Sequence, residues 1–185
     1  SHNASALATG VFDSVSIETG GSVPPPPPPA LPAGWESRDI GAVGAAGSAE
    51  ESGGVFTVIG AGEDVWDAAD AFHFAFVPMS GDGTITARVA SVSGTEAWTK
   101  VGVMIRGSTS ASSAHAFMLV SSGKGLAFQR RTADGILSTH TSGGAGVAPA
   151  WVRLTRSGNS ITAFVSSDGV SWTFVGSGTF VLAAH

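Results

Sequence analysis

Cysteine and tyrosine are both absent from this chain of 185 residues, and lysine occurs only twice, at Lys100 and Lys124. The absence of cysteine excludes disulfide bonds, thiolate zinc sites and cysteine nucleophiles. It does not decide the cellular compartment, because exported proteins without cysteine are common. Residues 1–10 have neither a basic start nor an apolar centre, so an export signal is expected upstream of this sequence if the protein is secreted.

Charge is also scarce. Charged residues make up 12% of the chain, which is about half the usual proportion for a soluble domain. The net charge is -5 with nine basic residues, and these form no basic stripe. We therefore expect no binding to nucleic acid and none to an anionic membrane surface. No apolar run approaches the roughly 18 residues of a membrane span, so no membrane insertion is expected.

Proline is concentrated in one place. Residues 20–34 read GGSVPPPPPPALPAG, and six consecutive prolines favour a polyproline II helix of roughly 19 Å. The flanks carry no basic anchor, which argues against an SH3-type ligand. The pattern indicates a semi-rigid spacer over 19–34, with residues 1–18 and residues 35–185 belonging to separate folded parts.

Short apolar runs alternate with Gly, Ser and Asp turns after the spacer, for example at Gly81-Asp82-Gly83 and Ser167-Asp168-Gly169. No stretch has sustained helical periodicity, although Asp64–Asp70 suits a single helical turn. The pattern predicts an all-β fold of two packed antiparallel sheets. The predicted strands are Val55–Ile59, Ala71–Val77, Thr84–Val92, Ala97–Ile105, His115–Ser121, Gly125–Arg131, Trp151–Arg156, Ser160–Ser166, Trp172–Val175 and Gly178–Leu182.

One predicted strand lies before the spacer. Leu7–Ile17 reads LATGVFDSVSI, and we predict that Val11, Val15 and Ile17 share a face. A lone apolar strand is not stable in water, so this segment must pair with another part of the protein. The residues expected to make that pairing are Leu7, Val11, Phe12, Val15 and Ile17.

Several motifs resemble those of the concanavalin A-like (laminin-G-like) jelly-roll domain that is repeated in large bacterial secreted proteins. They include Leu31–Trp35, Asp64–Trp66, Ala97–Arg106, Phe128–Arg131 and Ser167–Trp172. The resemblance covers about residues 31–182. It implies a two-sheet antiparallel jelly-roll sandwich and an extracellular or cell-surface location.

The resemblance has one departure. Domains of this family usually finish with a segment of the type Ser-His-Asn…Ala-Thr-Phe-Asp-Asn-Val, whereas here Ser1-His2-Asn3 and the matching strand come first. This implies that the sandwich of residues 35–185 lacks its own final strand. We expect residues 1–18 to insert into a neighbouring copy and to build a head-to-tail array or fibre. The intramolecular alternative stays open, since an extended spacer could reach back roughly 45 Å.

The stretch Glu63–Asp70 holds four carboxylates around Trp66. Oxygen ligands at such spacing can hold Ca²⁺, so a calcium ion bound by Asp64, Asp67 and Asp70 is one hypothesis, and one at Asp13 is another. The favoured alternative is a solvated turn whose carboxylates accept hydrogen bonds from backbone N–H groups. No other cofactor is indicated.

Catalysis is not expected, because the chain has no Glu-x-Asp-x-Glu pattern of the acidic glycosidases and no tyrosine base. Most of the five tryptophans suit a core; Trp66 with Asp64, Asp67 and Asp70 is the best candidate for a polysaccharide site. His73 and His115 lie in apolar strands and are expected to be satisfied there. Arg130, Arg131, Arg153 and Arg156 are assigned to strand edges and the surface. The preferred function is a structural or adhesive repeat, and the alternative is a carbohydrate-binding module.

Overall fold

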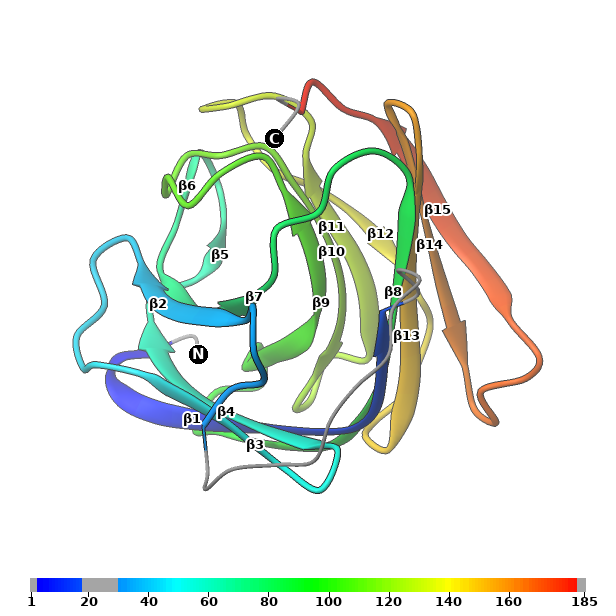
Figure 1. Cartoon of the computed structure of the whole chain (residues 1–185). Helices are drawn as coiled ribbons and strands as arrows, with labels where there is room; N and C mark the ends of the chain where they lie inside the picture. The colour runs from blue at the N-terminus through cyan, green and yellow to red at the C-terminus, as the bar shows by residue number, and fades with distance from the viewer. Residues whose placement is uncertain (1–2, 18–29, 183–185) are drawn as a thin grey trace.

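The computed structural model describes residues 3–17 and 30–182, which form strands and no helix (Figure 1). All paired strands are antiparallel, which confirms the predicted all-β class. The strands are β1 (Asn3–Ile17), β2 (Glu36–Ile40), β3 (Ser48–Ser52), β4 (Val55–Gly62), β5 (Val65–Trp66), β6 (Ala69–Asp70), β7 (Phe72–Phe76), β8 (Gly83–Ser93), β9 (Lys100–Arg106), β10 (His115–Ser121), β11 (Leu126–Arg131), β12 (Thr139–Ser142), β13 (Ala150–Ser157), β14 (Ser160–Ser166) and β15 (Thr173–Thr179).

Two sheets face each other. The larger has the order β15-β14-β13-β8-β1-β4-β3, and the smaller has the order β12-β11-β10-β9. In Figure 1 the larger sheet runs from the bottom of the molecule up its right side, with the smaller sheet inside this curve. The pairs β2-β7 and β5-β6 form two further small sheets. A helical turn over Asp64–Asp70 is therefore wrong, because β5 and β6 form a short hairpin there.

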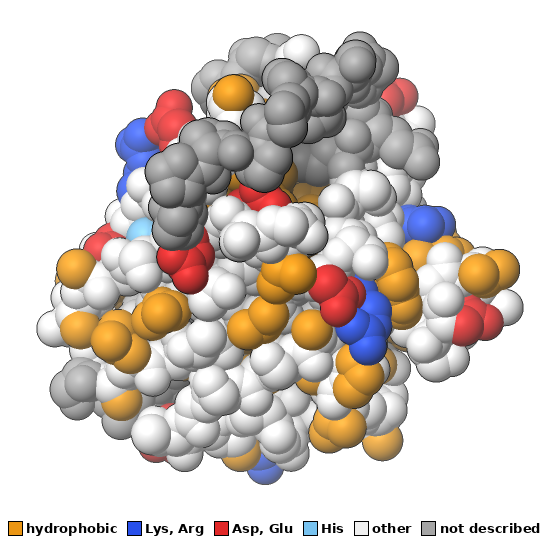
Figure 2. Space-filling model, turned by 60° about the horizontal axis from the view of Figure 1, so that its bottom comes forward, with side chains coloured by type: hydrophobic (Ala, Val, Ile, Leu, Met, Phe, Trp, Pro, Cys, Tyr) orange, Lys and Arg blue, Asp and Glu red, His pale blue; other side chains and the backbone are white. Residues whose placement is uncertain are grey.

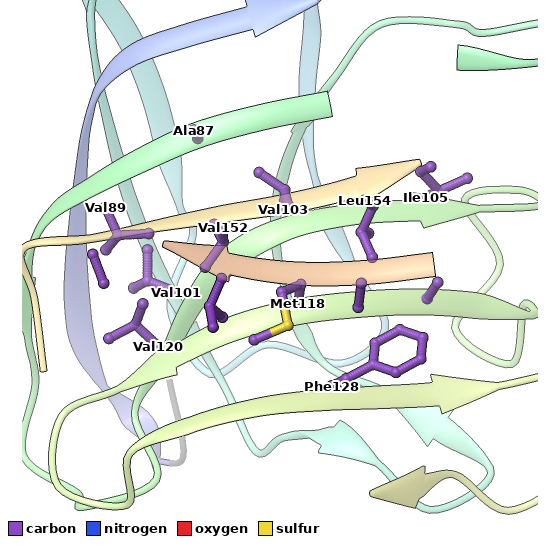
Figure 3. Close-up of a cluster of buried hydrophobic side chains, with 14 of the residues drawn as sticks. Ala87, Val89, Val101, Val103, Ile105, Met118, Val120, Phe128, Val152 and Leu154 are labelled. Atoms are coloured by element: carbon purple, nitrogen blue, oxygen red, sulfur yellow. The ribbon is translucent and has the colours of Figure 1, made fainter. Parts of the chain in front are cut away.

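The main core lies between the two sheets (Figure 3). Strand alternation directs every second residue inward. On β10, Met118 and Val120 face this core, whereas Phe117 and Leu119 face a second cluster. That second cluster includes Ile40, Val65, Phe72 and Met104. Burial on both faces explains why β10 reads as the continuous apolar run HAFMLVS.

Strand β1 lies inside the larger sheet, between β4 and β8 of the same chain. Gly10 is opposite Val58 on β4 and opposite Val92 on β8. Within this single chain the strand takes the intramolecular arrangement that the sequence left open, and its insertion into a neighbouring copy stays a prediction. In this chain β1 and the strands after the spacer share one sheet, while the assignment of residues 1–18 to a neighbouring copy stays a prediction. The spacer prediction falls largely on residues 18–29, which lie outside the described residues.

The faces of β1 differ from the prediction. Ala8, Gly10 and Phe12 are buried, so Val11 lies on the opposite face. The pairing with β8 is irregular after Asp13, and Ser14 has a φ of 52°. This bulge restores Val15 to the core side, where it packs against the main cluster. Val11 and Val15 therefore do not share a face, and the side chain of Ile17 lies outside the described residues.

The seating of β1 can be tested with two of its own side chains. Phe12 is 8% exposed and Leu7 is 53% exposed. Phe12→Ala removes a buried aromatic ring and is expected to lower the free energy of unfolding by about 3 kcal/mol. The control Leu7→Ala is expected to change it by less than about 0.5 kcal/mol. Urea unfolding measures both, and equal effects would contradict this register.

Candidate functional site

Among the described residues, a cluster of buried charged side chains lies beside the β5–β6 hairpin and is the main candidate site. Asp70 of β6 accepts two hydrogen bonds from Arg131 at the end of β11, with Oδ1–Nη2 at 2.7 Å and Oδ2–Nη1 at 3.0 Å. Both side chains have no exposed surface. A bidentate geometry of this kind is the strongest form of a carboxylate–guanidinium pair. The surface assignment of Arg131 is therefore wrong.

The remaining donors of Arg131 bind backbone carbonyls of loops. These carbonyls belong to Trp66 at 2.8 Å, Asp67 at 3.0 Å, Ser113 at 3.0 Å and Ile136 at 3.1 Å. A buried charge needs such complete hydrogen bonding to offset its desolvation. One side chain thus holds three separate loops against the end of the smaller sheet.

Two more titratable groups contact this pair. Arg106 Nη1 lies 3.3 Å and His115 Nδ1 lies 3.5 Å from Asp70 Oδ2. Burial, reinforced by the positive charges of Arg131 and Arg106, lowers the pKa of His115 to about 3. The imidazole is therefore neutral at pH 7. The prediction that His115 is a core histidine is consistent with this position, although its Nε2 has no partner among the described residues.

The structure does not bring the predicted calcium ligands together. Asp70 forms an ion pair with arginine, and Asp64 forms one with Lys100. Asp67 has an exposed side chain and a φ of 42°, and its carbonyl binds Arg131. Among residues 3–17 and 30–182, no three His, Asp or Glu side chains are grouped so as to hold a metal ion. The second candidate, Asp13, forms an ion pair with Arg88 across the β1–β8 ladder.

The predicted sugar-binding ring of Trp66 is also engaged. The Lys100 ammonium lies 5.7 Å from the centroid of the Trp66 ring and 5.5 Å from that of Trp98. Lys100 donates a hydrogen bond to Asp64 and a second, of 3.2 Å, to the Val65 carbonyl. Burial lowers the pKa of Lys100. These contacts use Trp66 to seat the hairpin and do not leave it as an open stacking surface.

A hollow of about 1490 Å³ lies between β1 and β4 on one side and β7 and β9 on the other. Its lining is mostly apolar and includes Phe12, Phe56 and Val103. His73 lines it too; its Nδ1 lies 2.8 Å from Asp39 Oδ1, and its Nε2 is buried with no partner among the described residues. The sequence analysis did not pair His73 with Asp39, because the two residues are 34 positions apart in the sequence.

The described residues contain no helix that could span a membrane. Comparison with family models, with curated proteins and with solved structures finds no match. The fold and the contacts described above therefore carry the functional argument.

The role of the buried pair is testable with a double-mutant cycle. Asp70→Ala and Arg131→Ala each leave one buried charge without its partner, and each is expected to cost about 3–5 kcal/mol. The double variant should cost clearly less than their sum. The control Asp67→Asn keeps a residue type that tolerates positive φ and should stay within about 0.5 kcal/mol. Additive costs in chemical unfolding would contradict a direct coupling.

His115 should make stability pH-dependent. Because its pKa falls from 6.5 to about 3 on folding, the unfolded chain binds the extra proton between these values. The contribution is complete above about pH 6.5 and is lost as the pH falls. Between pH 6 and pH 5 the wild type should lose about 1 kcal/mol that His115→Gln does not lose. His140 is the comparison: burial and the nearby Lys100 lower its pKa as well, so His140→Gln should remove only a smaller part of the slope. Equal slopes for the wild type and His115→Gln would contradict the assignment.

Proposed function

We propose that this protein is a non-catalytic extracellular structural or adhesive repeat with a concanavalin A-like jelly-roll sandwich. Its copies join head to tail when the first strand of one copy completes the larger sheet of the next. One observation supports this above all: β1 precedes the proline-rich segment of the sequence, yet it lies inside the larger sheet, between β4 and β8. A strand in that place is required by the sheet, whichever copy supplies it.

The contacts of β1 are of a kind that a second copy can reproduce. Its ladders to β4 and β8 are main-chain pairings on both edges, and such pairings give strength to strand complementation. Without β1, both β4 and β8 would have open edges that favour pairing with another chain. The contact between copies would be heterologous, so repetition without closure produces a fibre.

The gap between β4 and β8 that β1 occupies, here called the β1 slot, also selects the register of the strand that fills it. A Cβ atom on Gly10 would lie 2.6 Å from the Val101 side chain, so only glycine fits without a shift. Two residues later Phe12 enters the core, and Asp13 then meets Arg88. A slip of one residue would place Val11 against Val101 and reverse the faces. These three positions support recognition of this strand above other apolar strands.

The hollow beside β1 reduces the packing contacts between this strand and the rest of the protein. The buried residues of β1, Ala8, Gly10 and Phe12, line this space as well as the core. Lining atoms at a void lose packing contacts, so less apolar contact opposes withdrawal of the strand than in a fully packed core. This supports exchange of β1 between copies.

Engineered disulfides can distinguish the two arrangements, because the natural chain has no cysteine. Val11 on β1 lies directly opposite Thr57 on β4. We expect that an equimolar mixture of Val11→Cys and Thr57→Cys chains, unfolded together, refolded at high concentration and oxidised, yields a disulfide-linked heterodimer. The double variant, treated in the same way, should yield covalent ladders as well as closed monomers. Non-reducing electrophoresis separates these products.

The matched control pairs Leu7→Cys with Thr57→Cys, since Leu7 is on the same strand but is not the partner of Thr57 in this register. It should form little heterodimer. If the Val11 and Thr57 mixture forms none, and the double variant forms only closed monomers at every concentration, the strand serves its own chain alone. That result would overturn the assembly proposal.

A further inference from the structure

The outer face of the larger sheet carries a row of side chains that point away from the core and have no role in the proposed strand exchange. Direct pairings between neighbouring strands place Ser16, Thr86, Arg153, Phe164 and Phe174 in one line across β1, β8, β13, β14 and β15. The alternate residues of β13 and β14 belong to the main core and point inward. The row therefore forms a continuous strip on the outside of the molecule.

Arg153 stands at the centre of this strip with an unusual set of contacts. Its Nε donates a hydrogen bond of 2.9 Å to Thr86 Oγ1, and its guanidinium carbon lies 3.6 Å from the centroid of the Trp172 ring. No carboxylate among the described residues pairs with it, and no described residue accepts a hydrogen bond from its two terminal nitrogens. A guanidinium held by Nε and by an aromatic ring presents these nitrogens as a fixed fork.

Hydroxyl groups surround this fork. A small pocket of about 170 Å³ is lined by Arg153 together with Ser16, Thr84, Thr86 and Thr155. Thr84 and Thr155 share a hydrogen bond of 3.1 Å between their hydroxyls. The pocket therefore offers one fixed positive group and several oxygen donors and acceptors, with room for several water molecules or for one polar substituent of a ligand.

Aromatic surface borders the same strip. Phe174 is 59% exposed and lies edge-on to Phe164, with their ring centroids 6.1 Å apart. An exposed ring offers a flat apolar surface with a negative face, which suits the C–H side of a pyranose ring. Figure 2, a view from the lower side of Figure 1, shows few charged side chains and separate groups of hydrophobic ones.

The loop that carries Trp172 is held in place before any ligand arrives. The Asp168 carboxylate accepts hydrogen bonds from the backbone N–H groups of Val170 at 2.8 Å and Ser171 at 2.7 Å. These bonds lower the pKa of Asp168 to about 2, so the carboxylate remains ionised at neutral pH. A preformed loop reduces the entropy cost of binding.

We propose that this outer face binds a polysaccharide that contains uronic acid residues. The carboxylate of one uronic acid residue accepts hydrogen bonds from the two terminal nitrogens of Arg153, the pocket hydroxyls bind the hydroxyl groups of that sugar, and a neighbouring sugar ring lies on Phe174. The carboxylate decides the class of ligand, because a two-pronged guanidinium matches a carboxylate in shape and charge. The chain as a whole has a net charge of -5, so this recognition depends on the local geometry and not on long-range attraction.

Calorimetry with tetragalacturonate and the whole chain tests the proposal. We expect saturable binding of tetragalacturonate, at least tenfold weaker binding of the neutral maltotetraose, and no matching affinity for polyglutamate, which has carboxylates without sugar rings. Arg153→Lys keeps the charge but loses the fork, and should weaken binding at least tenfold. Phe174→Ala should weaken it roughly threefold or more.

The matched control is Arg38→Lys, because Arg38 also lies over an aromatic ring, 5.4 Å from the centroid of Phe76, but on β2. It should bind tetragalacturonate as the wild type does, and thermal unfolding should show that all variants are folded. Equal binding of maltotetraose or polyglutamate, an unchanged affinity of Arg153→Lys, or no binding by the wild type would each overturn the proposal. None of these results depends on whether β1 exchanges between copies.

Discussion

The buried contact between Arg131 and Asp70 is the interaction on which the rest of the smaller sheet depends. Removing two charges from water costs several kcal/mol for each ion, and the cost is offset here because every part of the guanidinium has an acceptor. By holding the β5–β6 hairpin, the pair keeps Val65 over the second cluster. Phe117 of β10 is thereby covered on the side away from the main core, and β10 can be apolar on both faces.

Strand β1 is subject to a different constraint, because it is central in the larger sheet but is separated in sequence from its partners β4 and β8 by the proline-rich segment. A central strand makes main-chain bonds on both edges, and these bonds do not depend on which copy supplies the strand. The side chains that select this particular strand are at three positions: Gly10 against Val101, Phe12 in the core, and Asp13 paired with Arg88. The proposed assembly therefore requires no surface beyond the one that folds the single chain.

The sequence predicted what local alternation determines, and failed where distant contacts decide. His115–Ser121 and Ser160–Ser166 were predicted with their observed bounds, since β10 and β14 have clear apolar patterns. The strands β2 and β3 were missed, because ESRDI and SAEES are polar runs, and β3 is an edge strand that exposes its charges. The partner of Asp70 is 61 residues away in the sequence. No local pattern distinguishes the buried Arg131 from an arginine that a strand exposes to solvent.

The two proposed roles support each other through repetition. A single site with one guanidinium fork and one exposed ring has few contacts, so weak binding is expected of one copy. A head-to-tail array would present the same Arg153 strip many times, and a polysaccharide repeats its uronate in the same way. Linked sites raise the effective concentration for each following contact, so avidity can exceed the affinity of one site by a factor of about 10²–10⁴. A sheet completed by strand exchange would then set the spacing of the outer sites, and the inner face of β1 and the outer face of β13 would serve one adhesive function.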